Sequence, residues 1–319
     1  MPTGLIMRST GSRYLVRGED GSLHDCVARG NLRIKGWKST NPVAVGDRVE
    51  YTAHTIGEEV GSITELHDRT NYLVRKSVNL SHHKHVIAAN LDQLFVLVTV
   101  ARPRTSYGFI DRMLVTAETY QVPAVILVNK VDDLDEEEQE QLFEVVDTYQ
   151  EAGYRVVMTA ALKGKGVKEV KEMLAGKVTL VAGHSGVGKS TLINAIDPEL
   201  DLFTLEISES SQKGQHTTTN AEMYELRSEV GVAKPTFIID TPGIKGFGLV
   251  DLDAAHIGDQ FPEMFRLKGD CRFNDCLHKD EPGCAIRKAV EEEVIAASRY
   301  RSYLDMLNGV EDETPYRTD

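Results

Sequence analysis

Three short polar segments of this chain carry residue patterns that bind nucleotides, and their order along the chain is unusual. Residues 183–190 read G-H-S-G-V-G-K-S, which fits the pattern of a phosphate-binding loop. Residues 129–132 read N-K-V-D, the pattern that selects guanine, and residues 240–243 read D-T-P-G, the pattern that responds to a terminal phosphate. An ordinary small GTPase has the phosphate-binding loop first and the base-selecting motif last. Here the base-selecting motif comes first, which predicts a circularly permuted GTPase fold.

The composition of the phosphate-binding loop has a chemical reason. Glycine lets the backbone bend tightly and turn its N–H groups inward around phosphate oxygens. We expect Lys189 to reach the β- and γ-phosphates, and the Ser190 hydroxyl to coordinate the Mg²⁺ that accompanies GTP. A helix that begins at Lys189 would direct the positive end of its dipole at the same anion. The predicted phosphate-binding residues are Gly183, His184, Ser185, Gly186, Val187, Gly188, Lys189, Ser190 and Thr191.

The base-selecting motif follows an apolar run, 122–128, that predicts a buried strand. The motif therefore lies at the carboxyl end of a strand, where open α/β sheets bind ligands. The Asp132 carboxylate can accept hydrogen bonds from the ring N–H and the exocyclic amine of guanine. Adenine lacks this pair of donors, so a buried Asp132 would lose its partners and binding would weaken. We therefore predict GTP and GDP as ligands, held by Asn129, Lys130, Val131 and Asp132.

Three further segments are expected to complete the nucleotide site. Asp240 ends the apolar run 236–239 and would hold Mg²⁺ through water, while the N–H of Gly243 would bind the γ-phosphate. The polar stretch 214–219 lies where the first switch loop belongs, and one of its threonines, 217–219, would bind Mg²⁺; the sequence does not decide which. Residues 159–161, after the strand-like run 155–158, are placed where a second base-contacting loop should lie.

The residue that positions the attacking water is not the usual one. Many GTPases use a glutamine directly after the glycine of D-x-x-G. This chain has Ile244 at that place, which cannot hydrogen-bond to water. His216, in the expected first switch loop, is our candidate for this catalytic role, together with Lys189 at the phosphates. The alternative is that His216 is only a solvated loop histidine.

A second constellation lies near the C-terminus, with the spacing C-x4-C-x-H-x5-C. Thiolates and imidazole together suit tetrahedral Zn²⁺, and four protein ligands leave no open position, so the site would be structural. The spacing departs from the common C-x2-C of zinc fingers, and incidental buried cysteines are the alternative. We predict one structural Zn²⁺ per chain, bound by Cys271, Cys276, His278 and Cys284.

Composition limits the class of protein. The chain has 319 residues, enough for two or three domains, and no run approaches the ~18 apolar residues of a membrane span. Four cysteines are too few for a disulfide framework at this length, which favours the cytoplasm. The net charge of −13 argues against nucleic acid, yet residues 1–89 carry 12 Lys and Arg against nine Asp and Glu. Local patches, and not the total charge, set the affinity for nucleic acid.

The remaining sequence predicts how these motifs are positioned. Short strand-like segments with turns between them suggest a small barrel in the first part, for which we predict an OB-fold over an SH3-like barrel. From residue 90 buried strands alternate with helices, predicted at 109–120, 136–152 and 167–174, which is typical of a doubly wound sheet of about six strands. The predicted organisation is a β-barrel over 1–68, a basic linker over 69–89, the permuted GTPase domain over 90–250 and a zinc-binding α-helical domain over 251–319.

Together, the barrel, the permuted motif order and the cysteine–histidine spacing resemble the RsgA/YjeQ family of small-subunit-dependent GTPases over essentially the whole chain. The resemblance implies a GTPase that binds the small (30S) ribosomal subunit and its rRNA, assists its late maturation and is stimulated by it. We also expect a monomer in the cytoplasm without a membrane partner. The alternative is a GTP-dependent regulatory switch that binds a protein partner without RNA. GTPase assays with and without small subunits separate the two.

Overall fold

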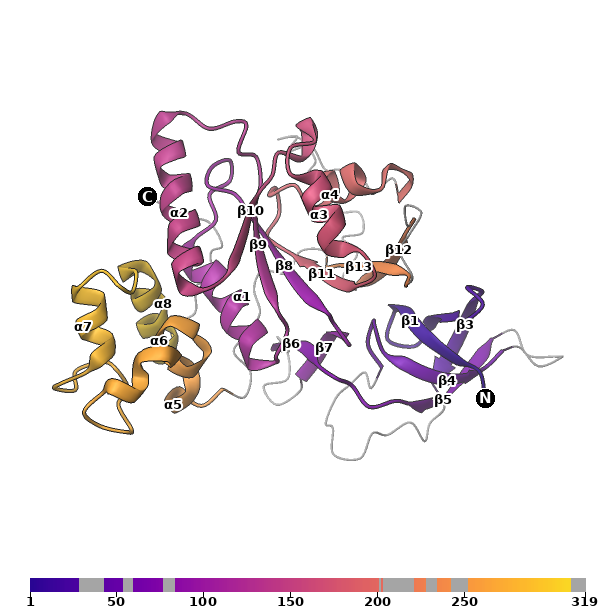
Figure 1. The fold of residues 1–319 in the computed structure, drawn as a ribbon. Coiled ribbons are helices and arrows are strands. Elements are labelled where there is room, and N and C mark those ends of the chain that lie inside the picture. The colour runs from indigo at the N-terminus through magenta and orange to yellow at the C-terminus, as the bar shows by residue number, and fades with distance from the viewer. Residues whose placement is uncertain are drawn as a thin grey trace, which may run out of the picture.

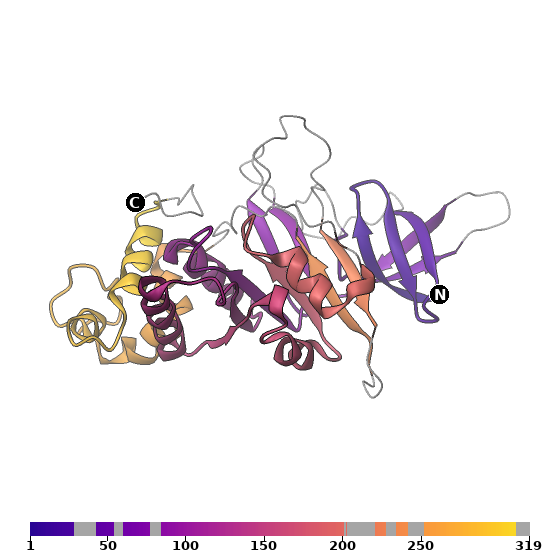
Figure 2. The same cartoon turned by 90° about the horizontal axis from the view of Figure 1, so that it is seen from above.

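The computed structural model describes residues 1–28, 43–53, 60–76, 84–200, 202, 221–227, 234–241 and 252–310. Its three parts lie in a row, with the N-terminal barrel at one end, the α/β domain in the middle and the C-terminal helices at the other end (Figures 1 and 2). One sheet of eleven strands runs through the barrel and the α/β domain, in the order β10-β9-β8-β11-β13-β12-β1-β2-β3-β5-β4. The multi-domain fold class predicted from the sequence is confirmed.

The N-terminal strands form a closed five-stranded barrel. Pairing of β1 with β4 closes the ring β1-β2-β3-β5-β4, in which β3 and β5 run parallel and the other pairs are antiparallel. Its interior is filled by apolar side chains that include Ile6, Tyr14, Val16 and Ile63. This topology fits the predicted OB-fold. The strands are β1 (Thr3–Ser9), β2 (Tyr14–Gly18), β3 (Leu23–Ala28), β4 (Arg48–Thr52) and β5 (Gly61–Leu66).

The segment 69–89, expected to be a basic linker, instead contains a β-hairpin in its described part. Strands β6 (Tyr72–Lys76) and β7 (Lys84–Ala89) pair antiparallel as a separate two-stranded sheet. The linker prediction was wrong because a few apolar residues suffice here: Leu73 and Val74 are fully buried against the core. Arg69, before the hairpin, forms a two-pronged ion pair with the fully buried Asp47.

The central domain has the predicted six-stranded doubly wound sheet. Five strands run parallel and β12 lies antiparallel beside β13. Alternate side chains of β8 belong to two different cores: Leu94 and Val96 pack with α1 and α2, whereas Phe95 and Leu97 pack with α3 and α4. All six residues of β8 are therefore buried, as expected for a strand covered on both faces. The strands are β8 (Gln93–Val98), β9 (Ala124–Val128), β10 (Arg155–Met158), β11 (Val178–Ala182), β12 (Glu222–Leu226) and β13 (Thr236–Asp240).

Capping residues in the sequence mark both ends of helix α2 in the central domain. The acidic run after the base-selecting motif starts α2, because Asp135 and Glu138 form a reciprocal capping box, and Gly153 in a left-handed conformation ends that helix. The helices are α1 (Tyr107–Thr119), α2 (Glu136–Ala152), α3 (Val167–Leu174) and α4 (Lys189–Ile196), with 3-10 turns η1 (Ala161–Lys163) and η2 (Pro198–Leu200).

The C-terminal part is a small helical domain packed on α1 and α2 (Figure 1). Its core contains Phe261, Ile286 and Tyr303, and Val115 of α1 belongs to the same cluster. Within the residues that the structure describes, no helix is long and apolar enough to cross a membrane. The helices are α5 (Ala254–Ile257), α6 (Pro262–Leu267), α7 (Ala285–Glu291) and α8 (Ala297–Leu307), with 3-10 turns η3 (Gly258–Gln260) and η4 (Lys268–Asp270).

Candidate nucleotide site and metal cluster

The motifs predicted to bind the nucleotide follow strands that run parallel in one sheet. Residues 129–132 follow β9, residues 159–161 follow β10, residues 183–190 follow β11, and Asp240 ends β13. Because the carboxyl ends of parallel strands meet at the same edge of a sheet, these segments come together there. The phosphate-binding loop follows β11, a central strand that lies between β8 and β13. The sheet thus unites motifs that are far apart in the sequence.

Asn129 joins three of these segments through its side-chain amide. Its Nδ2 donates to the backbone oxygen of Val187 in the phosphate-binding loop, at 2.9 Å. Its Oδ1 accepts from the Thr159 hydroxyl at 3.0 Å and from the backbone N–H of Ala161 at 3.2 Å. Gly188 gives Asn129 this access, since a Cβ at Gly188 would lie 2.5 Å from Nδ2. The structure therefore places the base-selecting motif, the 159–161 loop and the phosphate-binding loop in direct contact.

The other two polar residues of the base-selecting motif are held at the rim of this site. Lys130 adopts a left-handed backbone (φ 64°), and its Nζ donates to the backbone oxygen of Arg102 at 2.7 Å. Burial lowers the pKa of Lys130. Asp132 Oδ2 lies 3.2 Å from Lys163 Nζ, and its side chain remains partly exposed. A partly exposed carboxylate beside the 159–161 loop is available to a ligand, as base selection by Asp132 requires.

Lys189 at the start of α4 and Asp240 at the end of β13 bring two opposite charges to the site. Lys189 begins α4, and its Nζ donates to the backbone oxygen of Gly183 at 3.1 Å. Burial raises the pKa of Asp240, a shift that the Lys189 ammonium opposes, and burial lowers the pKa of Lys189. Asp240 Oδ1 is buried and has no hydrogen-bond partner in the described part of the chain. An orphaned buried carboxylate oxygen beside a phosphate-binding loop fits an outer-sphere contact to hydrated Mg²⁺, whose inner ligands would include the Ser190 hydroxyl.

Several predicted residues cannot be placed. His216, the candidate for positioning water, and residues 217–219 lie outside the described residues. The same is true of Gly243 and Ile244. Their assignments remain predictions from the sequence.

The four predicted metal ligands converge in the C-terminal domain. One ligand atom from each of the four lies within 4.8 Å of all the others. His278 Nδ1 is 3.5 Å from the Sγ atoms of both Cys271 and Cys284. Tetrahedral zinc with Zn–N of ~2.0 Å and Zn–S of ~2.3 Å would separate the nitrogen from each sulfur by about 3.5 Å. Backbone N–H groups of Ala285 and Arg287 point at the sulfurs of Cys271 and Cys284, at 3.4 and 3.5 Å. The donor set and its spacing fit Zn²⁺ bound by thiolates.

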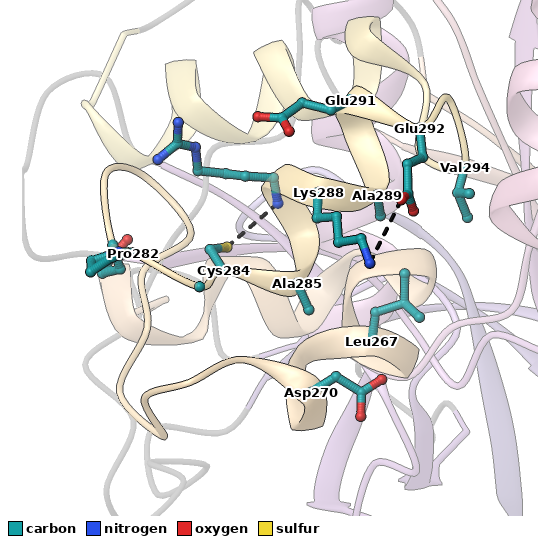
Figure 3. A pocket seen from close by; sticks show the side chains of 13 residues that line it. Leu267, Asp270, Pro282, Cys284, Ala285, Lys288, Ala289, Glu291, Glu292 and Val294 are labelled. Atoms are coloured by element: carbon teal, nitrogen blue, oxygen red, sulfur yellow. Dashed lines mark hydrogen bonds and ion pairs between the residues drawn. The ribbon is translucent and has the colours of Figure 1, made fainter.

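A groove of about 620 Å³ lies beside this cluster, along α7 (Figure 3). It is lined by charges of both signs, among them Asp270, Lys288 and Glu292, and the last two are paired at 3.6 Å. None of the residues of the nucleotide motifs lines this groove. The nucleotide site is therefore distinct from it.

Sequence reasoning missed the loop after β8, which contacts both nucleotide motifs. Arg102 receives the Lys130 hydrogen bond and pairs with Asp133 and Glu138. Thr105 bonds to the ring of His184 in the phosphate-binding loop. The position of this loop could be predicted, because it also follows a buried apolar strand and so lies at the same sheet edge. Its role could not be predicted, because its residues match no nucleotide-binding motif.

Comparison with known proteins agrees with this geometry. A family model described as RsgA GTPase matches residues 66–250, and one described as RsgA N-terminal domain matches residues 3–61. A protein named "Small ribosomal subunit biogenesis GTPase RsgA" from Flavobacterium johnsoniae is 52% identical over 318 residues, which cover 99% of this chain and 95% of that protein. A protein of the same name from Bacteroides fragilis is 50% identical over 309 residues, which cover 97% of each.

Two solved structures are also similar over nearly the whole chain. YjeQ from Thermotoga maritima has a TM-score of 0.75 at 33% identity and is matched over 97% of this chain and 98% of its own. YloQ, described as a circularly permuted GTPase, has a TM-score of 0.71 at 26% identity over 99% of this chain and 97% of its own. The permuted order of the motifs, their meeting at one sheet edge and the match over all three parts agree with one another. The chain belongs to the RsgA family and is a circularly permuted GTP hydrolase.

Proposed function

We propose that this GTPase acts in the biogenesis of the small ribosomal subunit, binding the subunit and its rRNA as a cytoplasmic monomer during late maturation. Support comes from the relatives of that name, which the chain matches over nearly their full length. The barrel and the helical domain lie on opposite sides of the GTPase domain, so both can contact a large partner at once (Figure 2).

The observation that carries the hydrolytic part of the proposal is the placement of Lys189 at the start of α4 and of Asp240, with its unpartnered buried oxygen in the described part of the chain, at the end of the neighbouring strand β13. Lys189 would bind the β- and γ-phosphates, and the N–H groups of the loop 183–190 would cradle them. Asn129 fixes that loop to the base-selecting motif, and Asp132 would recognise guanine. Mg²⁺, held by Ser190 and through water by Asp240, would neutralise the charge that develops during phosphoryl transfer. His216 is proposed to position the attacking water.

We also propose that the cluster of Cys271, Cys276, His278 and Cys284 holds one structural Zn²⁺. Support comes from the 3.5 Å spacing of its ligand atoms and from the burial of Cys284 and His278. A closed set of four protein ligands leaves no position for a substrate, so the ion would stabilise the domain and take no part in GTP hydrolysis.

The decisive experiment measures GTP turnover by the purified protein alone, with small subunits and with large subunits. We expect small subunits to raise turnover and large subunits to have no effect, and Lys189→Ala to show little turnover in all three conditions. Equal turnover in every condition would contradict a role at the small subunit. That result, combined with nucleotide-dependent capture of a protein free of RNA, would instead favour a regulatory switch.

A further inference from the structure

His184, the second residue of the phosphate-binding loop, is buried although its side chain is polar. Only 2% of its surface is exposed. Its Nε2 lies 2.7 Å from the Thr105 hydroxyl and its Nδ1 lies 2.9 Å from the backbone oxygen of Ser185. Its ring also packs edge-to-face against Phe109 of α1, with centroids 5.6 Å apart. The imidazole is therefore fixed in position and in orientation.

The partners of the ring determine where its proton lies. A backbone carbonyl oxygen can only accept a hydrogen bond, so Nδ1 must carry a hydrogen and donate it to Ser185. Burial lowers the pKa of His184, and the positive charges of Lys189 and Lys130 add to that shift. The neutral ring then has Nε2 as an acceptor, to which the Thr105 hydroxyl donates. The same hydroxyl accepts a hydrogen bond from the N–H of Thr99, the residue directly after β8, at 3.1 Å.

This arrangement fixes the direction of one peptide group. In a trans peptide the C=O and the N–H point in opposite directions. With the Ser185 carbonyl held by the buried ring, the N–H of the same peptide, which belongs to Gly186, points away from the ring. Asn129, which is also buried, has the same effect two residues further along the loop. It holds the Val187 carbonyl, so the N–H of Gly188 points away from Asn129. Both glycines have positive φ, 85° and 94°, which permits these peptide orientations.

We propose that His184 is a positioning residue for the nucleotide: its Nδ1–H holds the Ser185 carbonyl on the buried side of the loop, so that the Gly186 N–H faces the phosphates. The inference rests on the proposed binding of GTP at this loop. The competing explanation is that His184 only fills space between the loop and α1. An apolar side chain of similar size would satisfy that role, whereas the positioning role requires a donor at the place of Nδ1.

Variants of His184 separate these roles. His184→Asn keeps an amide N–H close to the place of Nδ1 and loses the contact to Thr105. His184→Gln reaches toward Thr105 but has no donor at Nδ1, and His184→Leu fills the volume with no donor at all. Since a hydrogen bond to a charged group contributes about tenfold or more to affinity, we expect GDP to bind about tenfold or more weakly to the leucine and glutamine variants. We expect the asparagine variant to stay within about threefold of the wild type.

A second readout reports on the peptide itself. In the wild-type protein and in His184→Asn, GDP should shift the NMR signal of the Gly186 amide proton downfield, as expected for a hydrogen bond to phosphate. In His184→Leu this shift should be absent, while thermal unfolding without nucleotide serves as the measure of packing. If the leucine variant does not fold, the GDP affinities of the asparagine and glutamine variants provide the same test. Equal affinities in those two variants, or an unchanged Gly186 shift in the leucine variant, would overturn the proposal. Failure of the wild type to bind GDP would instead contradict the proposed nucleotide site.

Discussion

The ion cluster around Arg299 should determine whether the C-terminal domain stays docked on the GTPase. Arg299, in α8, is 1% exposed and donates to Glu263 of α6 at 2.7 and 3.1 Å and to Asp111 of α1 at 2.6 Å. Its guanidinium also lies over the Phe261 ring, 4.6 Å from the centroid. One side chain thus links two helices of the C-terminal domain to a helix of the GTPase domain. We predict that Arg299→Met undocks or unfolds the C-terminal domain.

The expected loss in the free energy of unfolding follows from the groups that Arg299→Met leaves without a partner. Methionine keeps much of the apolar stem, so little packing is lost, but two buried carboxylates lose their counter-charge. Breaking a buried ion pair by removing one partner costs about 3–5 kcal/mol. If the loss is caused by the orphaned charges, then adding Asp111→Asn and Glu263→Gln to Arg299→Met should recover a large part of it.

The loss should also depend on pH. Burial raises the pKa of Asp111, and the Arg299 guanidinium opposes that shift. Without the guanidinium, the folded-state pKa of Asp111 rises further above its unfolded value. A carboxyl with a raised folded-state pKa favours the folded state below its unfolded pKa and loses that contribution as pH rises. The destabilisation by Arg299→Met should therefore be smaller at pH 5 than at pH 8.

Urea unfolding followed by circular dichroism, with hydrogen exchange of the C-terminal domain, measures the effect. Arg301→Met is the matched control, because Arg301 lies in the same helix and is exposed. We expect the control to change the free energy of unfolding by less than about 0.5 kcal/mol. An unchanged free energy in Arg299→Met, or a loss that is equal at pH 5 and pH 8, would refute the reasoning.

Three further predictions concern the nucleotide and metal sites. Asp132→Asn should shift the preference from guanine toward xanthine nucleotides, whose carbonyl replaces the guanine amine; competition binding measures this, and equal turnover of ATP and GTP by the wild type would contradict it. Lys189→Ala should fold normally but lower GTP turnover by about 10²–10³-fold, since a charge at the phosphates is lost; normal single-turnover rates would exclude Lys189 from the mechanism. Metal analysis should find one zinc per chain, and Cys276→Ser should lower the melting temperature of the C-terminal domain while GDP affinity stays unchanged; a metal-free protein with normal melting would be inconsistent with a structural ion.

Buried strands and motif positions could be predicted from the sequence because their signals are local. Apolar runs marked the parallel strands of the GTPase, and the glycines and lysine of 183–190 marked the start of α4. Strands β1 and β12 were not assigned from the sequence. In β1 the adjacent residues Ile6 and Met7 are both buried, and in β12 only Met223 and Leu226 are, so neither strand shows the strict alternation of a half-buried strand. The hairpin in 69–89 was missed for a related reason, because Leu73 and Val74 are a small apolar signal in a charged segment.

Contacts between distant residues were beyond sequence reasoning. Asn129 was predicted to read the base, and the structure shows in addition that it bonds to Val187 and to the 159–161 loop. Arg299 looked like any arginine on a helix, and only the fold brings Asp111 and Glu263 to it. Residue types report a local chemistry, whereas these bonds depend on how the helices pack on the sheet. The four predicted metal-binding residues lie within fourteen residues of sequence, which explains why their convergence could be predicted.

The structure connects both flanking domains to the nucleotide site through short routes. On one side, β12 precedes the strand that ends in Asp240 and pairs with β1 of the barrel, and Arg17 of the barrel forms a two-pronged ion pair with Glu225 of β12. On the other side, α1 starts beside His184 and carries Asp111, the partner of Arg299 in the C-terminal domain. A change at the phosphates that moves β12 or α1 must therefore also strain a domain contact. By linkage, a partner that binds both flanking domains would change nucleotide affinity to the same extent as the nucleotide changes partner affinity.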